Sequence, residues 1–390
     1  MVKLKNERVN IYLSGGGTKC SYQGTFLKRL NENNNYSTEN IIGLSFGSIV
    51  GYMACLGLYD EIIEFCKNLT PTALVPCSNL YIYIMKFSEI VSKIPLIGTY
   101  MSQHIAVIAK ILWIVIAISQ KGLFIPEFGE KYLEKIHTQN IEDSDAKLNK
   151  FWCIVYNVTK NKLEIINGTH PLIKKYLVAS CSLWIIFPPV KITRLSTECD
   201  CVDGCNCSKS EIYCTCSNES HKINEFIDPG FIRFIPYGND SIYGNSEFSR
   251  RINDKNIDIN LVCTTMNIKR LGDNTCNFTT GNNLFEYLDN LVTMCADMSQ
   301  KNVIQNEWNR YINSKTYIIN YESPIKKPTD INREMINKIL ADGEKLYDKF
   351  IDTNNLPHQN DPNQVPRLNH HQLLQDSQLL LIELDSSPEQ

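Results

Sequence analysis

The stretch from residue 10 to residue 58 constrains the fold more than any other part of the chain. Its pattern predicts a strand, a glycine turn, a helix, a second strand, a serine turn and a second helix, in that order. The first apolar run, residues 9–13, stops before Gly15-Gly16-Gly17, and apolar residues at helical spacing follow over residues 22–30. Three consecutive glycines permit positive φ and close backbone approach. Amide groups at a turn that opens a helix form a cradle for an anion, so we expect an anion-binding turn here.

A second turn follows a brief apolar strand at residues 40–42. Its sequence, Gly43-Leu44-Ser45-Phe46-Gly47, fits the pattern G-x-S-x-G and precedes an apolar helical run over residues 48–58. A serine at such a strand-to-helix corner projects its hydroxyl outward, while the flanking glycines let neighbouring backbone approach. The two turns together predict a nucleophile, Ser45, beside donors for an oxyanion.

These turns and a later aspartate resemble the marks of the patatin-like phospholipases, which are a GGGxRG-type turn, a GxSxG serine and a DGG or DGA aspartate. The corresponding positions here are Gly15 to Cys20, Gly43 to Gly47, and Asp228-Pro229-Gly230. The chain departs from the family pattern at Lys19, where arginine is preferred, and at Cys20 and Pro229, where glycine is preferred. The resemblance implies a three-layer α/β/α sandwich with a mostly parallel central sheet.

The resemblance also implies the chemistry. Ser45 would attack a lipid ester and Asp228 would accept its proton. The remaining implied site residues are Gly15, Gly16, Gly17, Thr18 and Lys19 around the oxyanion, and the motif glycines Gly43, Gly47 and Gly230. An aspartate with an ordinary pKa of ~3.9 is a poor base, so a pocket of low dielectric must raise that pKa. Taken alone, Asp228-Pro229-Gly230 would also fit an ordinary turn.

The histidines offer little support for a Ser-His-Asp triad. His137 and His170 lie in polar, turn-like surroundings. The others lie beside an apolar run, in a cysteine-rich segment or near the C-terminus, at His104, His221, His358, His370 and His371. An ordinary α/β-hydrolase also places several strands before its serine turn, whereas here only one strand precedes the strand that leads into Ser45, so that fold ranks second.

The expected activity is hydrolysis of carboxylic esters in phospholipids or lysophospholipids, through an acyl-enzyme and at a membrane surface. An acylglycerol lipase or transacylase with the same two residues is an alternative within the enzymes. A catalytically silent lipid-binding or scaffold protein of the same fold is an alternative of another class, which Cys20 and Pro229 keep open. No cofactor is expected for catalysis.

Charge and cysteine usage bear on partners and compartment. The net charge of -3 provides no electrostatic attraction to nucleic acid. Residues 1–10 lack the apolar segment of a secretory signal, and several of the 15 cysteines lie in apolar surroundings that suit buried thiols. We therefore expect an intracellular protein that associates with membranes and is not secreted. The asparagine- and isoleucine-rich composition resembles that of giant DNA virus proteins, which would make this compartment the host cytoplasm.

Two predicted insertions interrupt the domain, and the first is an apolar helical one at about residues 71–121. Its run at residues 105–118 contains few polar residues apart from Lys110. A membrane-spanning helix needs ~20 apolar residues, and this run is shorter. A buried helix, a cap that rests on lipid with Trp113 near the interface, and a true span all remain open.

The second insertion is a cysteine-rich hairpin at about residues 196–222. It contains Cys199, Cys201, Cys205, Cys207, Cys214 and Cys216. Thiolates at this density suit tetrahedral zinc in a structural role, although the spacing is not that of a C-x-x-C knuckle. Redox-labile thiols and disulfides are the alternatives, and a reducing compartment disfavours disulfides.

The rest of the chain predicts one α/β domain over residues 9–352, with an N-terminal arm at 1–8 and a mostly disordered tail at 353–390. Within this tail, residues 373–384 are predicted to form one short amphipathic helix. Further strands are predicted at residues 151–158, 163–166, 190–192, 225–227, 258–265 and 315–321. Further helices are predicted at residues 59–67, 128–136, 171–180, 283–304 and 331–351.

Overall fold

A computed structural model provides the fold. It describes residues 6–33, 35–68, 133, 144–183, 188–193, 223–233, 235–236, 240–265, 315–323, 332–355 and 379–382. The apolar run at 105–118, the six clustered cysteines and the helix predicted at 283–304 lie outside these ranges, so the expectations for them stay predictions.

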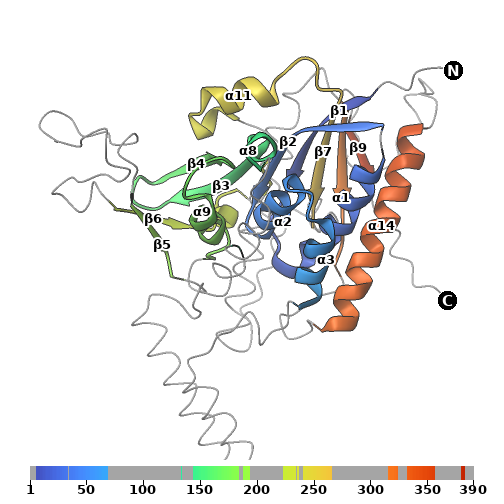
Figure 1. Ribbon diagram of the computed structural model, residues 1–390, viewed down its shortest axis with the longest axis horizontal. Helices are drawn as coiled ribbons and strands as arrows, with labels where there is room; N and C mark the ends of the chain where they lie inside the picture. Colours follow the sequence, from blue (N-terminus) through green and yellow to red (C-terminus); the bar gives the residue numbers. More distant parts are fainter. Residues whose placement is uncertain are drawn as a thin grey trace, which may run out of the picture.

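A nine-stranded sheet forms the centre of the molecule, in the order β5-β6-β3-β2-β1-β7-β8-β9, with β4 also paired to β3 (Figure 1). The strands are β1 (Glu7–Leu13), β2 (Tyr36–Leu44), β3 (Phe151–Asn157), β4 (Lys162–Asn167), β5 (Val190–Thr193), β6 (Ile223–Ile227), β7 (Ile259–Thr264), β8 (Lys315–Asn320) and β9 (Leu379–Ile382). Pairing is parallel from β3 across to β9 and antiparallel among β3, β4, β5 and β6. The predicted mostly parallel α/β sheet is confirmed.

Helices cover both faces of this sheet (Figure 1). The α-helices are α1 (Tyr22–Glu32), α2 (Phe46–Cys55), α3 (Tyr59–Asn68), α8 (Ser144–Leu148), α9 (Ile173–Ser180), α11 (Ser246–Ile252) and α14 (Arg333–Asn355). Short 3-10 helices are η1 (Gly17–Ser21), η3 (Pro229–Phe231) and η4 (Asp240–Tyr243). Because strand side chains alternate between faces, Ile11 and Leu13 of β1 pack in the core cluster with α1, α2 and α14, whereas Tyr12 packs in the cluster with Phe248 and Ile252 of α11.

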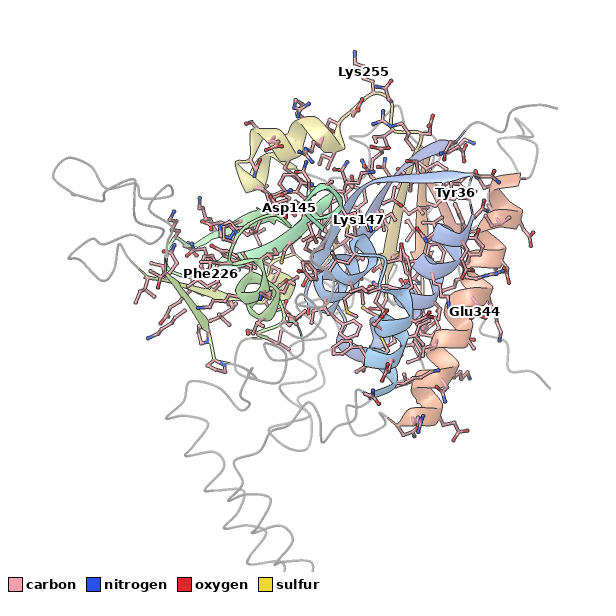
Figure 2. The ribbon with its side chains drawn as sticks, viewed as in Figure 1. Tyr36, Asp145, Lys147, Phe226, Lys255 and Glu344 are labelled. Carbon is pink, nitrogen blue, oxygen red and sulfur yellow. The ribbon has the colours of Figure 1, made fainter. Side chains whose placement is uncertain are left out.

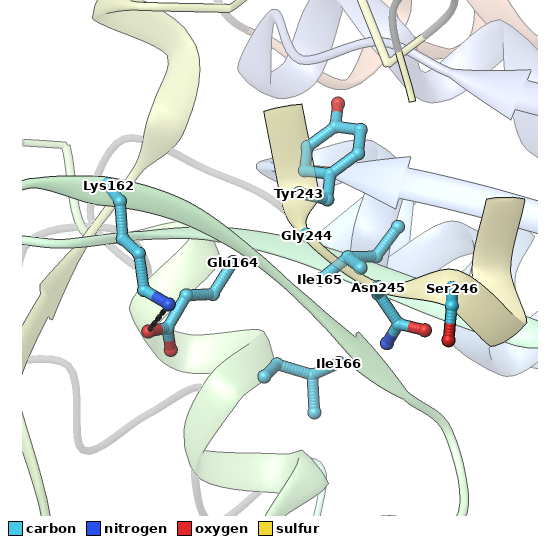
Figure 3. Close-up of a pocket in the computed structure, with 8 residues that line it drawn as sticks. All are labelled: Lys162, Glu164, Ile165, Ile166, Tyr243, Gly244, Asn245 and Ser246. Atoms are coloured by element: carbon cyan, nitrogen blue, oxygen red, sulfur yellow. Dashed lines mark ion pairs between the residues drawn. The ribbon is translucent and has the colours of Figure 1, made fainter. Parts of the chain in front are cut away.

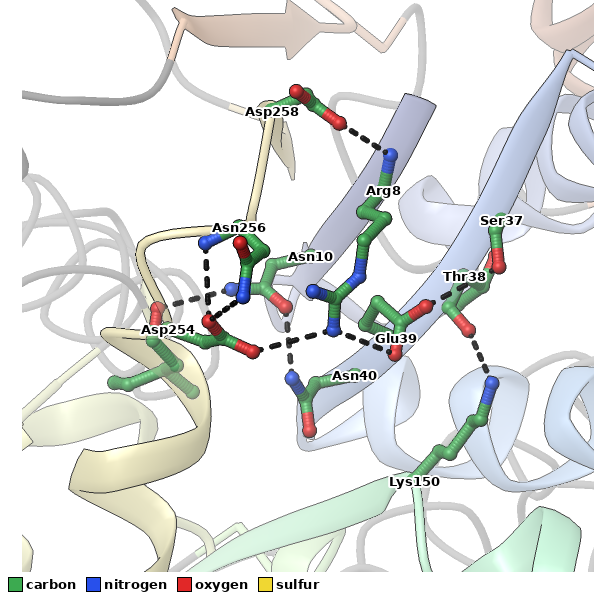
Figure 4. Close-up of polar contacts among 11 residues, drawn as sticks. Arg8, Asn10, Ser37, Thr38, Glu39, Asn40, Lys150, Asp254, Asn256 and Asp258 are labelled. Atoms are coloured by element: carbon green, nitrogen blue, oxygen red, sulfur yellow. Dashed lines mark hydrogen bonds and ion pairs between the residues drawn. The ribbon is translucent and has the colours of Figure 1, made fainter. Parts of the chain in front are cut away.

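A polar network joins β1 and β2 at their amino ends (Figure 4). The Arg8 guanidinium forms ion pairs with Glu39 at 3.3 Å and with Asp254 at 3.2 Å. The Asn40 amide donates to the Asn10 side-chain oxygen at 2.9 Å, and both side chains are buried. This network lies at the amino ends of the strands, whereas Ser45 lies at their carboxyl ends, so we regard the network as structural.

The tail contributes a strand where the sequence predicted a helix. Residues 379–382 form β9, which pairs in parallel with β8. The predicted helix over residues 373–384 is wrong for these four residues. Their sequence, Leu-Leu-Leu-Ile, has no helical period, and the edge of β8 offers unpaired backbone groups that an apolar strand can satisfy.

Helix α14 packs tightly against α1 at Gly343. A Cβ at this position would overlap the carbonyl oxygen of Tyr22 and the hydroxyl of Thr25. The Thr25 hydroxyl itself donates to the carbonyl of Leu340 at 2.6 Å, one turn earlier on α14. Glycine at residue 343 therefore lets the two helices approach closely enough to share this hydrogen bond.

We predict that Gly343→Ala destabilises the fold, although alanine is normally the better helix former by about 1 kcal/mol. The added methyl must displace α1 backbone, and we expect a loss of about 1–3 kcal/mol in the free energy of unfolding. Urea unfolding followed by circular dichroism measures it. Glu344→Ala is the matched control, because Glu344 is the next residue of the same helix and its side chain is exposed (Figure 2). Equal stability of Gly343→Ala and the wild type would contradict the tight crossing.

Candidate active site

Ser45 occupies a strained corner between β2 and α2. Its backbone has φ 51° and ψ -134°, a conformation that residues with a Cβ rarely adopt. The glycines on either side are required by close backbone contacts. A Cβ at Gly47 would lie 2.6 Å from the carbonyl oxygens of Leu13 and Ser14, and a Cβ at Gly43 would lie 2.5 Å from the carbonyl of Gly47. This geometry is that of a strand-to-helix serine turn.

The glycine turn packs directly against this serine. A Cβ at Gly15 would lie 2.9 Å from the Cβ of Ser45. Gly16 and Gly17 have φ values of 142° and 57°, which favour glycine. Within the described part of the chain, the N–H groups of Gly15 and Gly16 donate to no backbone carbonyl, whereas the N–H of Lys19 donates to Gly16 at 3.3 Å. Among the described residues, the amides of Gly15 and Gly16 therefore have no backbone acceptor and could donate to a ligand.

Hydrogen bonds to the carbonyl of Ser14 also stabilise the glycine turn. It accepts hydrogen bonds from the Cys20 thiol at 3.5 Å and from the Gln23 side chain at 3.3 Å. Cys20 stands where the family pattern has glycine, and its thiol here supplies a donor that glycine would lack. The departure at Cys20 is thus compatible with a formed turn. Sequence reasoning did not identify Gln23, because nothing in its spacing indicates that it reaches back to Ser14.

Asp228 lies at the carboxyl end of β6 and is only 4% exposed. Its N–H donates to the carbonyl of Ser182 at 2.9 Å, and its Oδ1 accepts from the N–H of Gly230 at 2.7 Å. Burial raises the pKa of Asp228 to about 7, against the opposing effect of hydrogen bonds from the Ser45 hydroxyl and the Gly230 N–H, which lower it. The Ser45 side chain is therefore near enough to affect this carboxyl group, and the pairing of the two residues in catalysis stays a prediction.

The way in which three strands pair with β3 explains why Ser45 and Asp228 lie near each other. Strand β4 pairs with β3 from Trp152 to Asn157 and so occupies one whole edge of β3. Strands β2 and β6 also pair with β3, in parallel and antiparallel directions respectively, and must therefore share its other edge. The β2 pairing ends at Ile154 and the β6 pairing is confined to Tyr156 and Asn157. Val155 is left between the two pairings.

Strands β2 and β6 both end at this gap, and their carboxyl ends face each other. Leu44, the last residue of β2, pairs with Ile154, and Ile227, the last residue of β6, pairs with the residue beyond Val155. Ser45 and Asp228 are the next residues along their respective chains. They lie near each other because the two strands run toward each other along the same edge of β3.

Other nucleophiles and bases in the described part of the site fit less well. Burial raises the pKa of the Cys153 thiol to about 12, so the thiolate is not populated at neutral pH. His170 lies before α9, at the opposite end of this helix from Ser180, where its Nδ1 accepts from the N–H of Leu172 at 3.0 Å. The other six histidines lie outside the described residues.

A separate shallow pocket lies between β4 and the segment that joins η4 to α11 (Figure 3). It has a volume of about 330 Å³, and Lys162 and Glu164 form an ion pair at 3.4 Å in its wall. Neither Ser45 nor Asp228 lines it. Among the residues that the structure describes, no group of histidine, cysteine or acidic side chains is arranged to hold a metal ion. Of the described helices, none combines the length and apolar composition that crossing a bilayer requires.

A parallel α/β sheet with a serine turn at its carboxyl edge defines an acyl hydrolase class of fold, and comparison with known proteins specifies the family. The family model for patatin-like phospholipases matches residues 11–237, more than half of the 390 residues. The chain belongs to this family, which assigns it to the hydrolases that act on lipid esters. No curated protein sequence matches the chain significantly.

Among solved structures, the chain is similar to VipD from Legionella pneumophila. The TM-score is 0.37 and the sequence identity 15%, over 89% of this chain and 67% of that chain. A likeness this distant adds nothing to the family assignment.

We predict that Asp228→Asn stabilises the protein at pH 8. A buried carboxyl group with a pKa of about 7 in the folded protein, against an ordinary pKa of 3.8, takes up a proton on folding between these two pH values. Stability from this group is therefore present at low pH and lost as the pH rises toward 7. Removing the charge should restore about 1–4 kcal/mol at pH 8 and almost nothing at pH 4, by urea unfolding.

Asp254→Asn is the control for this experiment, because hydrogen bonding to Asn256 lowers the pKa of Asp254. That variant should show a difference of opposite sign, with the wild type favoured at pH 8. An Asp228→Asn stability difference that is the same at both pH values would contradict the raised pKa.

Proposed function

We propose that this protein cleaves carboxylic ester bonds of phospholipids or lysophospholipids, with Ser45 as the nucleophile and Asp228 as its proton acceptor. The observation that supports it most is the strand register that places Ser45 and Asp228 directly after two strand ends facing each other along β3, beside the glycine turn. Asp228 lies in a site that lacks a better base among the described residues, and its pKa of about 7 suits proton exchange near neutrality.

The proposed reaction has two stages. As the Ser45 Oγ attacks the ester carbonyl, its proton passes to Asp228 and a tetrahedral oxyanion forms. The carbonyl then re-forms, the bond to the leaving alcohol breaks, and Asp228 gives its proton to that alcohol. In the second stage a water molecule attacks the acyl-enzyme, Asp228 takes the water's proton, and the same carboxyl group returns it to Ser45 as the fatty acid leaves.

The oxyanion would be held by the N–H groups of Gly15 and Gly16. In comparable sites one such donor contributes roughly 3 kcal/mol to the stabilisation of the transition state. The N-terminus of α2, which begins directly after Ser45, adds a favourable dipole for negative charge. Helix η1 contains Gly17, Thr18 and Lys19, which would support the turn.

One exposed apolar side chain close to Asp228 in the chain would suit a lipid substrate. Ile232, four residues after Asp228, is 49% exposed, which is unusual for a large aliphatic side chain. We propose that it contacts acyl chains or a membrane surface. The substrate itself stays at the level of lipid ester, with acylglycerols as the alternative to phospholipids.

We predict that a fluorophosphonate probe labels the wild type at Ser45, because the probe reacts with an activated serine hydroxyl. Ser45→Ala should show no labelling, whereas Ser37→Ala, which alters a serine at the amino end of β2, should label normally. Mass spectrometry of the labelled peptide makes the assignment. A folded wild type that stays unlabelled would contradict the proposal and favour a catalytically silent lipid-binding protein.

We predict an acid limb in the pH profile of kcat/KM with mixed phospholipid and acylglycerol vesicles as substrates. Only the ionised Asp228 accepts a proton, so kcat/KM should fall roughly tenfold per pH unit below a midpoint of about 7. Fatty acid release measured by titration gives the profile for each lipid. A midpoint near 4 would contradict the burial of the base, and release from acylglycerol alone would replace the phospholipase assignment by that of a lipase.

A further inference from the structure

The ladder between β2 and β3 ends with an inserted side chain. At the start of the ladder, the N–H of Ile41 donates to the carbonyl of Lys150 at 2.9 Å. The same parallel repeat, continued by four residues, would join the N–H of Ser45 to the carbonyl of Ile154. Instead, the N–H of Ser45 donates to the Ser180 Oγ at 2.8 Å, and this hydroxyl donates to the carbonyl of Ile154 at 2.7 Å.

We propose that Ser180 is a positioning residue, whose hydroxyl acts as a spacer in the last step of the ladder and sets the orientation of Ser45. This inference rests on the proposed function, because it concerns the same nucleophile. Ser180 does not touch the reacting atoms. It acts through the backbone of Ser45, at the point where the chain leaves the sheet.

The spacer accounts for the backbone of the serine turn. A strand that continued along β3 would hold Ser45 in an extended conformation with negative φ. With the hydroxyl of Ser180 between the two main chains, the N–H of Ser45 stays bonded while the residue adopts φ 51°. Without the hydroxyl, the buried N–H must either lose its partner or move toward Ile154, and both outcomes shift the Ser45 Oγ away from Asp228.

Helix α9, which carries Ser180, packs against β6, and the segment that follows it bonds to the backbone of Asp228. Tyr176 of α9 packs edge-on against Phe226 of β6, with ring centroids 5.1 Å apart. Ser180 is fully buried. Two residues further on, the carbonyl of Ser182 accepts from the N–H of Asp228 at 2.9 Å. One end of α9 therefore binds the backbones of both Ser45 and Asp228 and fixes the separation between them.

A small hydroxyl side chain fills this role. The group must accept from an N–H and donate to a carbonyl at the same time, which serine and threonine can do. Alanine can do neither. Threonine keeps the hydroxyl and so separates the effect of the hydrogen bonds from that of the volume.

The experiment compares Ser180→Ala and Ser180→Thr with the wild type, and Thr25→Val serves as a control that removes a buried hydroxyl bonded to a carbonyl of α14. The first measurement is hydrogen exchange of the Ser45 amide, which needs no activity. The second is the rate of fluorophosphonate labelling, with kcat and KM for vesicle hydrolysis.

We expect Ser180→Ala to exchange the Ser45 amide faster while the amides of residues 41–43 are unchanged. Labelling and kcat should fall roughly 10- to 100-fold with KM little altered, because small misplacement of a reacting group has effects of this size. Ser180→Thr and Thr25→Val should stay within about threefold of the wild type by the same reasoning.

The two measurements separate the possible failures. An unlabelled wild type refutes the proposed function, while hydrogen exchange still tests the spacer. Unchanged exchange in Ser180→Ala, or unchanged labelling in an active protein, overturns the spacer. Equal loss in Ser180→Ala and Ser180→Thr also overturns it, because the volume at residue 180 would then matter rather than the hydroxyl. If Ser180→Ala does not fold, the threonine variant alone decides, since a spacer requires it to label like the wild type.

Discussion

Main-chain pairing along a single edge of β3 is the constraint on which the site depends. β2 and β6 approach each other on this edge from opposite directions, and both must leave it at Val155. One chain leaves through Ser45 into α2 and the other leaves through Asp228 into η3. The proximity of Ser45 and Asp228, which are far apart in the chain, is therefore determined by strand register. Changes in the loops that connect these strands need not move the reacting pair.

The site is stable only because the rest of the fold compensates for it. A non-glycine residue with positive φ, such as Ser45, costs of order 1–3 kcal/mol. Asp228 is buried with a raised pKa, so its ionisation at neutral pH opposes folding. The two core clusters on opposite faces of the sheet, together with the polar network around Arg8, offset these costs. The backbone strain of Ser45 lies at the carboxyl ends of the parallel strands. Ion pairs and hydrogen bonds stabilise their amino ends.

The sequence was most informative where local pattern decides structure. Periodicity predicts β1, α1, β2 and α2, and the two glycine-containing turns point to Ser45 and to the turn at Gly15 as candidates. The aspartate needed the family resemblance as well, because Asp228-Pro229-Gly230 alone fits many turns. Ser180 could not be assigned a role, since its bond to the Ser45 amide depends on where β3 lies relative to β2. For the same reason β9 was predicted as a helix, because the free edge of β8 is a tertiary feature that no window of sequence contains.

The separation between Ser45 and Asp228 in a crystal structure tests this account most directly. We expect the Ser45 Oγ to lie about 3 Å from a carboxylate oxygen of Asp228, in hydrogen-bonding geometry, with the Ser45 N–H facing the hydroxyl of Ser180. An electron density map that places Asp228 beyond contact with Ser45, and a histidine ring in its place beside the serine hydroxyl, would contradict it.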